Sequence, residues 1–112
     1  MFKINLAVLE DLTEGSKAEM DDLLLAYNEV SAEFITAASQ TGSTSMIPLA
    51  NAAHKFRSIV HLVGLQSQVA DLAELERMAR PGHETDEITT LKQQILALAI
   101  AAQEQIDAHL AA

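Results

Sequence analysis

Apolar residues at helical spacing constrain the fold of this chain more than any other feature. They recur every three or four positions across residues 16–38, and again across residues 85–110. The first run begins with Ser16-Lys17-Ala18-Glu19, a capping box, and the second begins with Thr85 as a capping hydroxyl before two acidic residues. Runs that alternate with period two are missing, so the pattern predicts long amphipathic helices and an all-α fold.

Three shorter helices are predicted over residues 4–12, 46–64 and 66–80. Gly15 and Gly64 mark the ends of the first two, and Pro81-Gly82 ends the third. Pro48 suits the first turn of its helix, where its missing N–H costs nothing. Because the connections are short, including the loop at residues 41–45, neighbouring helices should be antiparallel. We therefore expect a single domain over residues 1–112, an antiparallel up-down four-helix bundle with a short N-terminal helix against it.

Composition excludes several classes of protein. The chain has 112 residues and no cysteine, which excludes disulfides and thiolate metal sites. Its formal charge of −9 argues against nonspecific nucleic-acid binding. No run approaches the length of a membrane span, and the apolar start at residues 1–8 is cut short by Glu10 and Asp11, unlike a signal peptide. We expect a cytoplasmic protein that binds neither membranes nor nucleic acid.

The stretch from 46 to 64, taken as one helix, separates its residues into two faces. A core face receives Leu49, Ala52, Phe56, Ile59, Val60 and Val63. The opposite face receives Ala50, His54, Arg57, Ser58 and His61. A histidine and a guanidinium one turn apart on an exposed face suggest a site that handles an anion.

This stretch resembles the phospho-acceptor helix of histidine phosphotransfer (HPt) domains. That family has His-x-Leu/Phe-Lys, then small residues, and a glycine ten positions after the histidine. Here His54, Phe56 and Gly64 match, Arg57 replaces the lysine, and Ser58 is small. Ile59 departs from the family's small residue, and its place on the core face predicts local repacking.

The resemblance implies a phosphoryl carrier that works between receiver domains. His54 would accept the group from a receiver aspartate of a hybrid histidine kinase and pass it to a response regulator. Arg57 would pair with the phosphoryl oxygens, while Ala50, Lys55, Ser58 and His61 would face the partner.

Other family features concern structure and cofactors. Phe56 and Gly64 would be structural, with Gly64 ending its helix rather than contacting phosphate. Mg²⁺ would come from the receiver, so neither a cofactor nor a metal is expected on this chain. Without a glycine-rich phosphate loop, no ATP site or kinase activity is expected. We expect a monomer.

Alternatives remain open. His61 is the second candidate acceptor, but its spacing of seven from His54 does not suit a shared zinc ion, which helical pairs bind at i, i+4. Glu76 falls within the helical stripe of residues 66–80, and the acidic residues in general resemble solvated faces. The chain could instead be an adaptor that docks receivers without chemistry, or a helical dimer built on the last helix.

Overall fold

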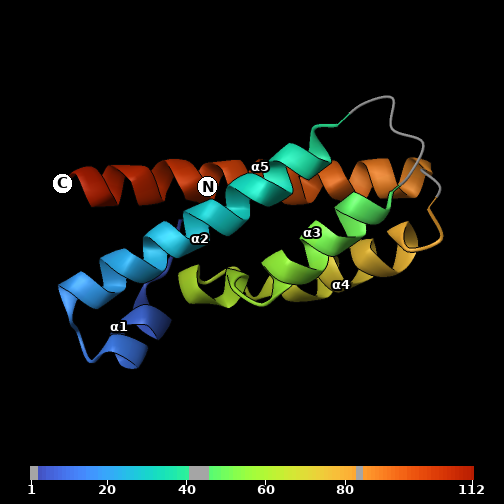
Figure 1. The fold of residues 1–112 in the computed structure, drawn as a ribbon. Coiled ribbons are helices and arrows are strands. Elements are labelled where there is room, and N and C mark those ends of the chain that lie inside the picture. The colour runs from blue at the N-terminus through green and yellow to red at the C-terminus, as the bar shows by residue number, and fades with distance from the viewer. Residues whose placement is uncertain (1–2, 41–45, 83–84) are drawn as a thin grey trace.

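The computed structural model describes residues 3–40, 46–82 and 85–112, and in these ranges the chain forms helices and no strands (Figure 1). There are five α-helices and one short 3₁₀ helix, namely α1 (Ala7–Thr13), α2 (Lys17–Ala38), α3 (Ile47–Arg57), η1 (Val60–Val63), α4 (Ser67–Ala79) and α5 (Asp86–Ala111). The all-α prediction is confirmed for these residues. The loop predicted at residues 41–45 lies outside the described residues. None of the described helices combines the length and the apolar character that crossing a membrane requires.

The four longer helices contact one another in a closed ring. Helix α3 packs against α2 and α4, while α5 packs against the same two helices from the other side. The chain reverses direction between successive long helices, as the colour order in Figure 1 shows. Helix α1 lies against α2 and η1 at one end. This arrangement brings α3 and α4 together along their length, which is where the candidate site lies.

Helix starts follow the capping signals in the sequence. The Ser16 hydroxyl accepts a hydrogen bond from the backbone N–H of Glu19 at 3.4 Å, and the Thr85 hydroxyl accepts one from Ile88 at 3.2 Å. Each bond satisfies one N–H that the first turn of a helix leaves unpaired. Both predicted N-caps are therefore confirmed.

The N-terminal helix departs from its prediction. It begins at Ala7 rather than at residue 4, and it ends through Glu14 and Gly15, which both have positive φ angles. The apolar spacing of residues 4–12 predicts that Leu12 is buried with Leu9, but this residue is 61% exposed. A seven-residue helix has too few turns to bury a complete stripe, and here it buries Leu9 and Thr13 instead.

Phe56 lies at the centre of the core. It is fully buried, stacks on Phe34 with ring centroids 5.2 Å apart, and approaches Tyr27 at 5.7 Å. Aromatic pairs in this range add to the stabilisation from burial alone. The three rings tie α3 to α2, so the structural role predicted for Phe56 is consistent with its position.

The helix predicted over residues 46–64 is wrong in its second half, because α3 ends at Arg57. The Ser58 hydroxyl donates to the Lys55 carbonyl at 2.7 Å, and the Ile59 N–H then bonds to Phe56, a tighter i→i−3 contact. Serine side chains compete with helix backbone bonds in this way. Residues 59–65 are almost entirely apolar, so one face of a helix could not bury all of them. Beyond the end of α3, this segment buries Val60, Leu62, Val63 and Leu65.

Gly64 ends η1 in a conformation that favours glycine. Its φ is +84°, and a Cβ added there would lie 2.7 Å from Cβ of Asn5. The Asn5 N–H donates to the carbonyl of Val63 at 3.0 Å, so the N-terminal segment runs directly against this turn. Gly64 therefore ends a helix, as predicted, and also permits close packing of the N-terminal segment.

Candidate functional site

His54 lies in the last turn of α3, on the side that faces α4. Its side chain is 60% exposed, although Ala53 and Phe56 beside it are fully buried. A ring at this position is accessible to a second protein while its backbone is held by the core. The exposure expected of His54 is confirmed.

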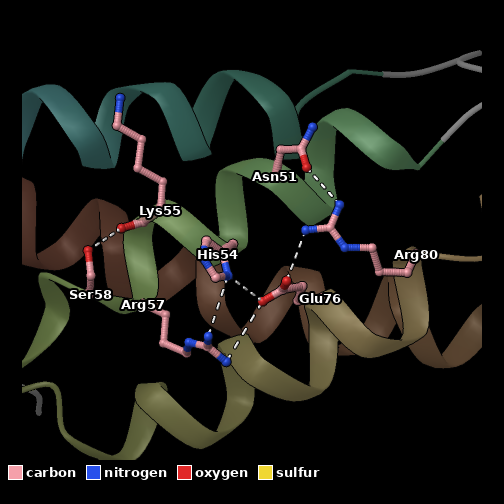
Figure 2. Close-up of polar contacts among 7 residues, drawn as sticks. All are labelled: Asn51, His54, Lys55, Arg57, Ser58, Glu76 and Arg80. Atoms are coloured by element: carbon pink, nitrogen blue, oxygen red, sulfur yellow. Dashed lines mark hydrogen bonds and ion pairs between the residues drawn. The ribbon is translucent and has the colours of Figure 1, made fainter.

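The δ nitrogen of His54 is occupied by a carboxylate from α4. Nδ1 lies 3.1 Å from Oε1 of Glu76 and 3.4 Å from Nη2 of Arg57 (Figure 2). One nitrogen cannot both donate to Glu76 and accept from Arg57. The carboxylate is the closer partner and carries a full charge, so the bond to Glu76 prevails and Nδ1 holds the ring proton. In the neutral ring, Nε2 then carries the free lone pair.

Arg57 lies beside the imidazole, as the sequence predicts. Its guanidinium is within 3.4 Å of the His54 ring, and its Nη1 lies 3.7 Å from Oε1 of Glu76. The side chain is 34% exposed. A permanent cation is thus in place next to the ring, where it can pair with an anion that approaches His54.

Glu76 collects three basic groups around one carboxylate. Besides His54 and Arg57, Nη2 of Arg80 lies 2.9 Å from its second oxygen, Oε2. The hydrogen bond from Arg80 is the main influence that lowers the pKa of Glu76 below its usual value, with His54 and Arg57 adding to it against partial desolvation. Only 16% of the Glu76 side chain is exposed. Glu76 is therefore an ionised carboxylate held in a defined position.

Arg80 also reaches helix α3. Its Nη1 donates to Oδ1 of Asn51 at 2.7 Å, while its Nη2 donates to Glu76. Asn51 precedes His54 by one turn of α3. Figure 2 shows Arg80 spanning from its own helix to Asn51, with Glu76 between Arg80 and the imidazole.

One of the predicted partner-facing residues is corrected by the structure. Ala50 is fully buried in the core cluster, so it does not face a partner. The predicted core face was placed partly from residues 59–63, which lie outside α3, so its centre was wrong. The residues that α3 buries are Leu49, Ala50, Ala53 and Phe56. His61 lies in η1 and is half-buried. It is not on the same helix as His54, and the expected alignment of the two histidines is wrong.

Lys55 and Ser58 are exposed beside His54, as expected. Lys55 turns toward α2 (Figure 2). Its Nζ lies 2.8 Å from Oε2 of Glu33 on that helix. Ser58 bonds to the backbone of its own helix and leaves its surroundings open to solvent. Both remain predicted contact residues for a partner. Ile59, expected in the core, is half-buried against it.

The sequence analysis missed the roles of Glu76, Arg80 and Asn51. Glu76 had been assigned only to a helical stripe and to solvated acidic surface. Its position inside a stripe otherwise made of apolar residues was the available signal, because that stripe faces the neighbouring helices. The sequence does not show that Glu76 faces α3 and His54, because this contact joins residues 22 positions apart.

Comparison of the chain with protein-family models, with curated proteins and with solved structures gives no match in any of the three. Across residues 3–40, 46–82 and 85–112, no group of three or more histidine and acidic side chains is arranged to hold a metal ion. The geometry around His54 is therefore what indicates a function.

Proposed function

We propose that this protein is a phosphorelay intermediate. His54 accepts a phosphoryl group from a receiver-domain aspartate and returns it to the aspartate of a response regulator. The observation that carries the proposal is an exposed imidazole whose Nδ1 is held by Glu76 and whose edge is flanked by Arg57. Such a ring would offer its second nitrogen, Nε2, as the nucleophile, with a cation beside the imidazole.

We further propose that the four longer helices constitute an antiparallel up-down bundle, with α1 as the short additional helix. The closed ring of helix contacts and the short connections support this architecture. A bundle suits a carrier because it holds one exposed side chain on a rigid helix, and a rigid nucleophile needs little reorganisation when a partner docks.

The transfer requires no general base on this chain. The Nε2 lone pair attacks the phosphorus of the aspartyl phosphate, an N–P bond forms, and the P–O bond to the aspartate breaks as its carboxylate leaves. Nδ1 keeps its proton, so the phosphorylated ring is cationic and the Glu76 carboxylate stabilises it. Arg57 pairs with the phosphoryl oxygens. Reversal of the same steps delivers the group to the next aspartate.

The test is transfer from a receiver. The purified protein is incubated with a receiver domain carrying labelled aspartyl phosphate and with Mg²⁺. We expect an acid-labile, base-stable label that is lost in His54→Gln. His61→Gln and His109→Gln are the matched controls and should label normally.

Persistence of the label in His54→Gln would overturn the assignment of the acceptor. If the protein binds the receiver without becoming labelled, and His54→Ala binds equally well, the function is that of a docking adaptor and not of a carrier.

A further inference from the structure

We propose that Arg80 is a positioning residue that acts on His54 through Glu76. The inference rests on the proposed function, in which Nε2 of His54 must be unprotonated and face outward. The Arg80 guanidinium bonds to Asn51 on α3 and to Glu76 on α4, and not to the imidazole itself. Its effect must pass through the carboxylate between them.

Arg80 fixes the orientation of the Glu76 carboxylate. The two oxygens of Glu76 have separate partners, since Oε2 bonds to Arg80 and Oε1 to Nδ1 of His54. A carboxylate bonded on one side only can rotate about its terminal torsion, which is broad and soft. Arg80 is itself held at 2.7 Å by Asn51, so it fixes Oε2 and leaves Oε1 directed at the imidazole. An arginine can make both contacts because its fork presents several donors in fixed directions.

Arg80 also offsets the charge of Glu76. An unbalanced carboxylate beside an imidazole favours the doubly protonated ring, which has no lone pair on Nε2. Here Arg57 at 3.7 Å and Arg80 at 2.9 Å offset the charge of Glu76. The other charged groups nearby are engaged elsewhere, since Lys55 pairs with Glu33 and Arg77 pairs with Glu74. Arg80 thus offsets part of the charge of the carboxylate whose other oxygen bonds to Nδ1 of His54.

The experiment compares Arg80→Gln with Arg77→Gln. Arg77 is a matched control because it lies in the last turn of α4, three residues before Arg80, is exposed, and pairs with Glu74. Nitrogen-15 NMR of the imidazole in the full chain at pH 7 measures the population of the neutral form protonated on Nδ1. We expect Arg80→Gln to lower this population relative to the other forms by about 3- to 10-fold, as expected for loss of one charged hydrogen bond, and Arg77→Gln to leave it unchanged.

Two further variants sharpen the result. Arg80→Lys keeps the charge but not the fork, so we expect a partial return toward the wild-type population. Asn51→Ala should produce a weaker form of the Arg80→Gln effect. An imidazole whose proton distribution is the same in wild type and Arg80→Gln would overturn the proposal.

The NMR measurement does not need phosphoryl transfer, so the positioning role of Arg80 and the carrier function are tested independently. If wild-type protein accepts no label but Arg80→Gln changes the imidazole, the positioning role stands and the carrier function falls. If label appears on His54 and Arg80→Gln leaves both the NMR populations and the transfer rate unchanged, the positioning role falls and the carrier function stands.

Discussion

Oε1 of Glu76 lies 3.1 Å from Nδ1 of His54, across the contact between α4 and α3. This pair gives the imidazole a defined orientation that an isolated surface histidine would lack. It also makes the site dependent on the packing of two helices, because neither side chain is held by its own helix alone.

Glu76→Gln should lower stability in a pH-dependent way. The pKa of Glu76 is lower in the folded protein than its usual value, chiefly because Arg80 hydrogen bonds to the ionised form. Its stabilisation is therefore complete above the unfolded pKa and is lost as the pH falls through the folded pKa. We expect Glu76→Gln to cost about 1 kcal/mol at pH 7 and the difference from wild type to disappear between about pH 5 and pH 2. Urea denaturation across this range measures it, and a constant difference would contradict the assignment.

Arg57 should stabilise the phosphorylated state rather than the fold. Arg57→Ala removes the cation beside the ring, and we expect about a 10-fold slower transfer from a phosphorylated receiver. Arg57→Lys keeps the charge, although not the planar fork, and should lose only about 2- to 3-fold. Initial rates of labelling measure both. If Arg57→Ala labels at the wild-type rate, the cation has no part in the transfer.

Ser58 should matter for docking and little for folding. Ser58→Tyr places a bulky side chain on exposed surface one turn beyond His54, so we expect receiver binding to weaken while the free energy of unfolding changes by less than about 1 kcal/mol. Ser58→Ala is the control of small size; it removes the hydroxyl bond to Lys55 and should keep receiver affinity. Binding is measured by calorimetry and stability by thermal melting. A large loss of stability in Ser58→Tyr would place this side chain in the core.

Gly64→Ala should destabilise the protein through both conformation and contact. The residue has a φ of +84°, and its Cβ would meet Asn5 at 2.7 Å. We expect a loss of about 2–4 kcal/mol from the strained backbone and the overlap together. Gly15→Ala is the control, because Gly15 has a φ of +78° but no described atom within 4 Å of its added Cβ; it should lose only about 1–2 kcal/mol. Equal losses in chemical denaturation would show that the contact with Asn5 is unimportant.

Tyr27→Phe should raise stability. The Tyr27 ring is fully buried, and its hydroxyl has no hydrogen-bond partner among the described residues. Removing an unsatisfied buried hydroxyl should gain about 1 kcal/mol. Burial also raises the pKa of Tyr27, so its contribution to stability is present below the unfolded pKa of about 10 and is lost as the pH rises further. Tyr27→Phe should therefore resist alkaline unfolding better than wild type in thermal melts at pH 9–11, and a less stable variant would show that the hydroxyl has a partner.

Local patterns determined much of this protein from its sequence alone. The capping serine and threonine predict where α2 and α5 begin, and the glycine at position 64 predicts a helix end, because those signals act within one or two turns. The same local spacing places Arg57 one turn from His54 and leaves the histidine exposed. These features needed no knowledge of how the helices pack.

Tertiary packing decided the rest. Helix α3 ends at Arg57, and the apolar run after it packs against α1 and the N-terminal segment. Ala50 is buried because neighbouring chain covers its small side chain. Glu76 and Arg80 reach His54 and Asn51 only because α4 lies beside α3. Spacing along the chain describes the faces of a single helix, whereas the partner of each face is set by the packing of helices distant in sequence.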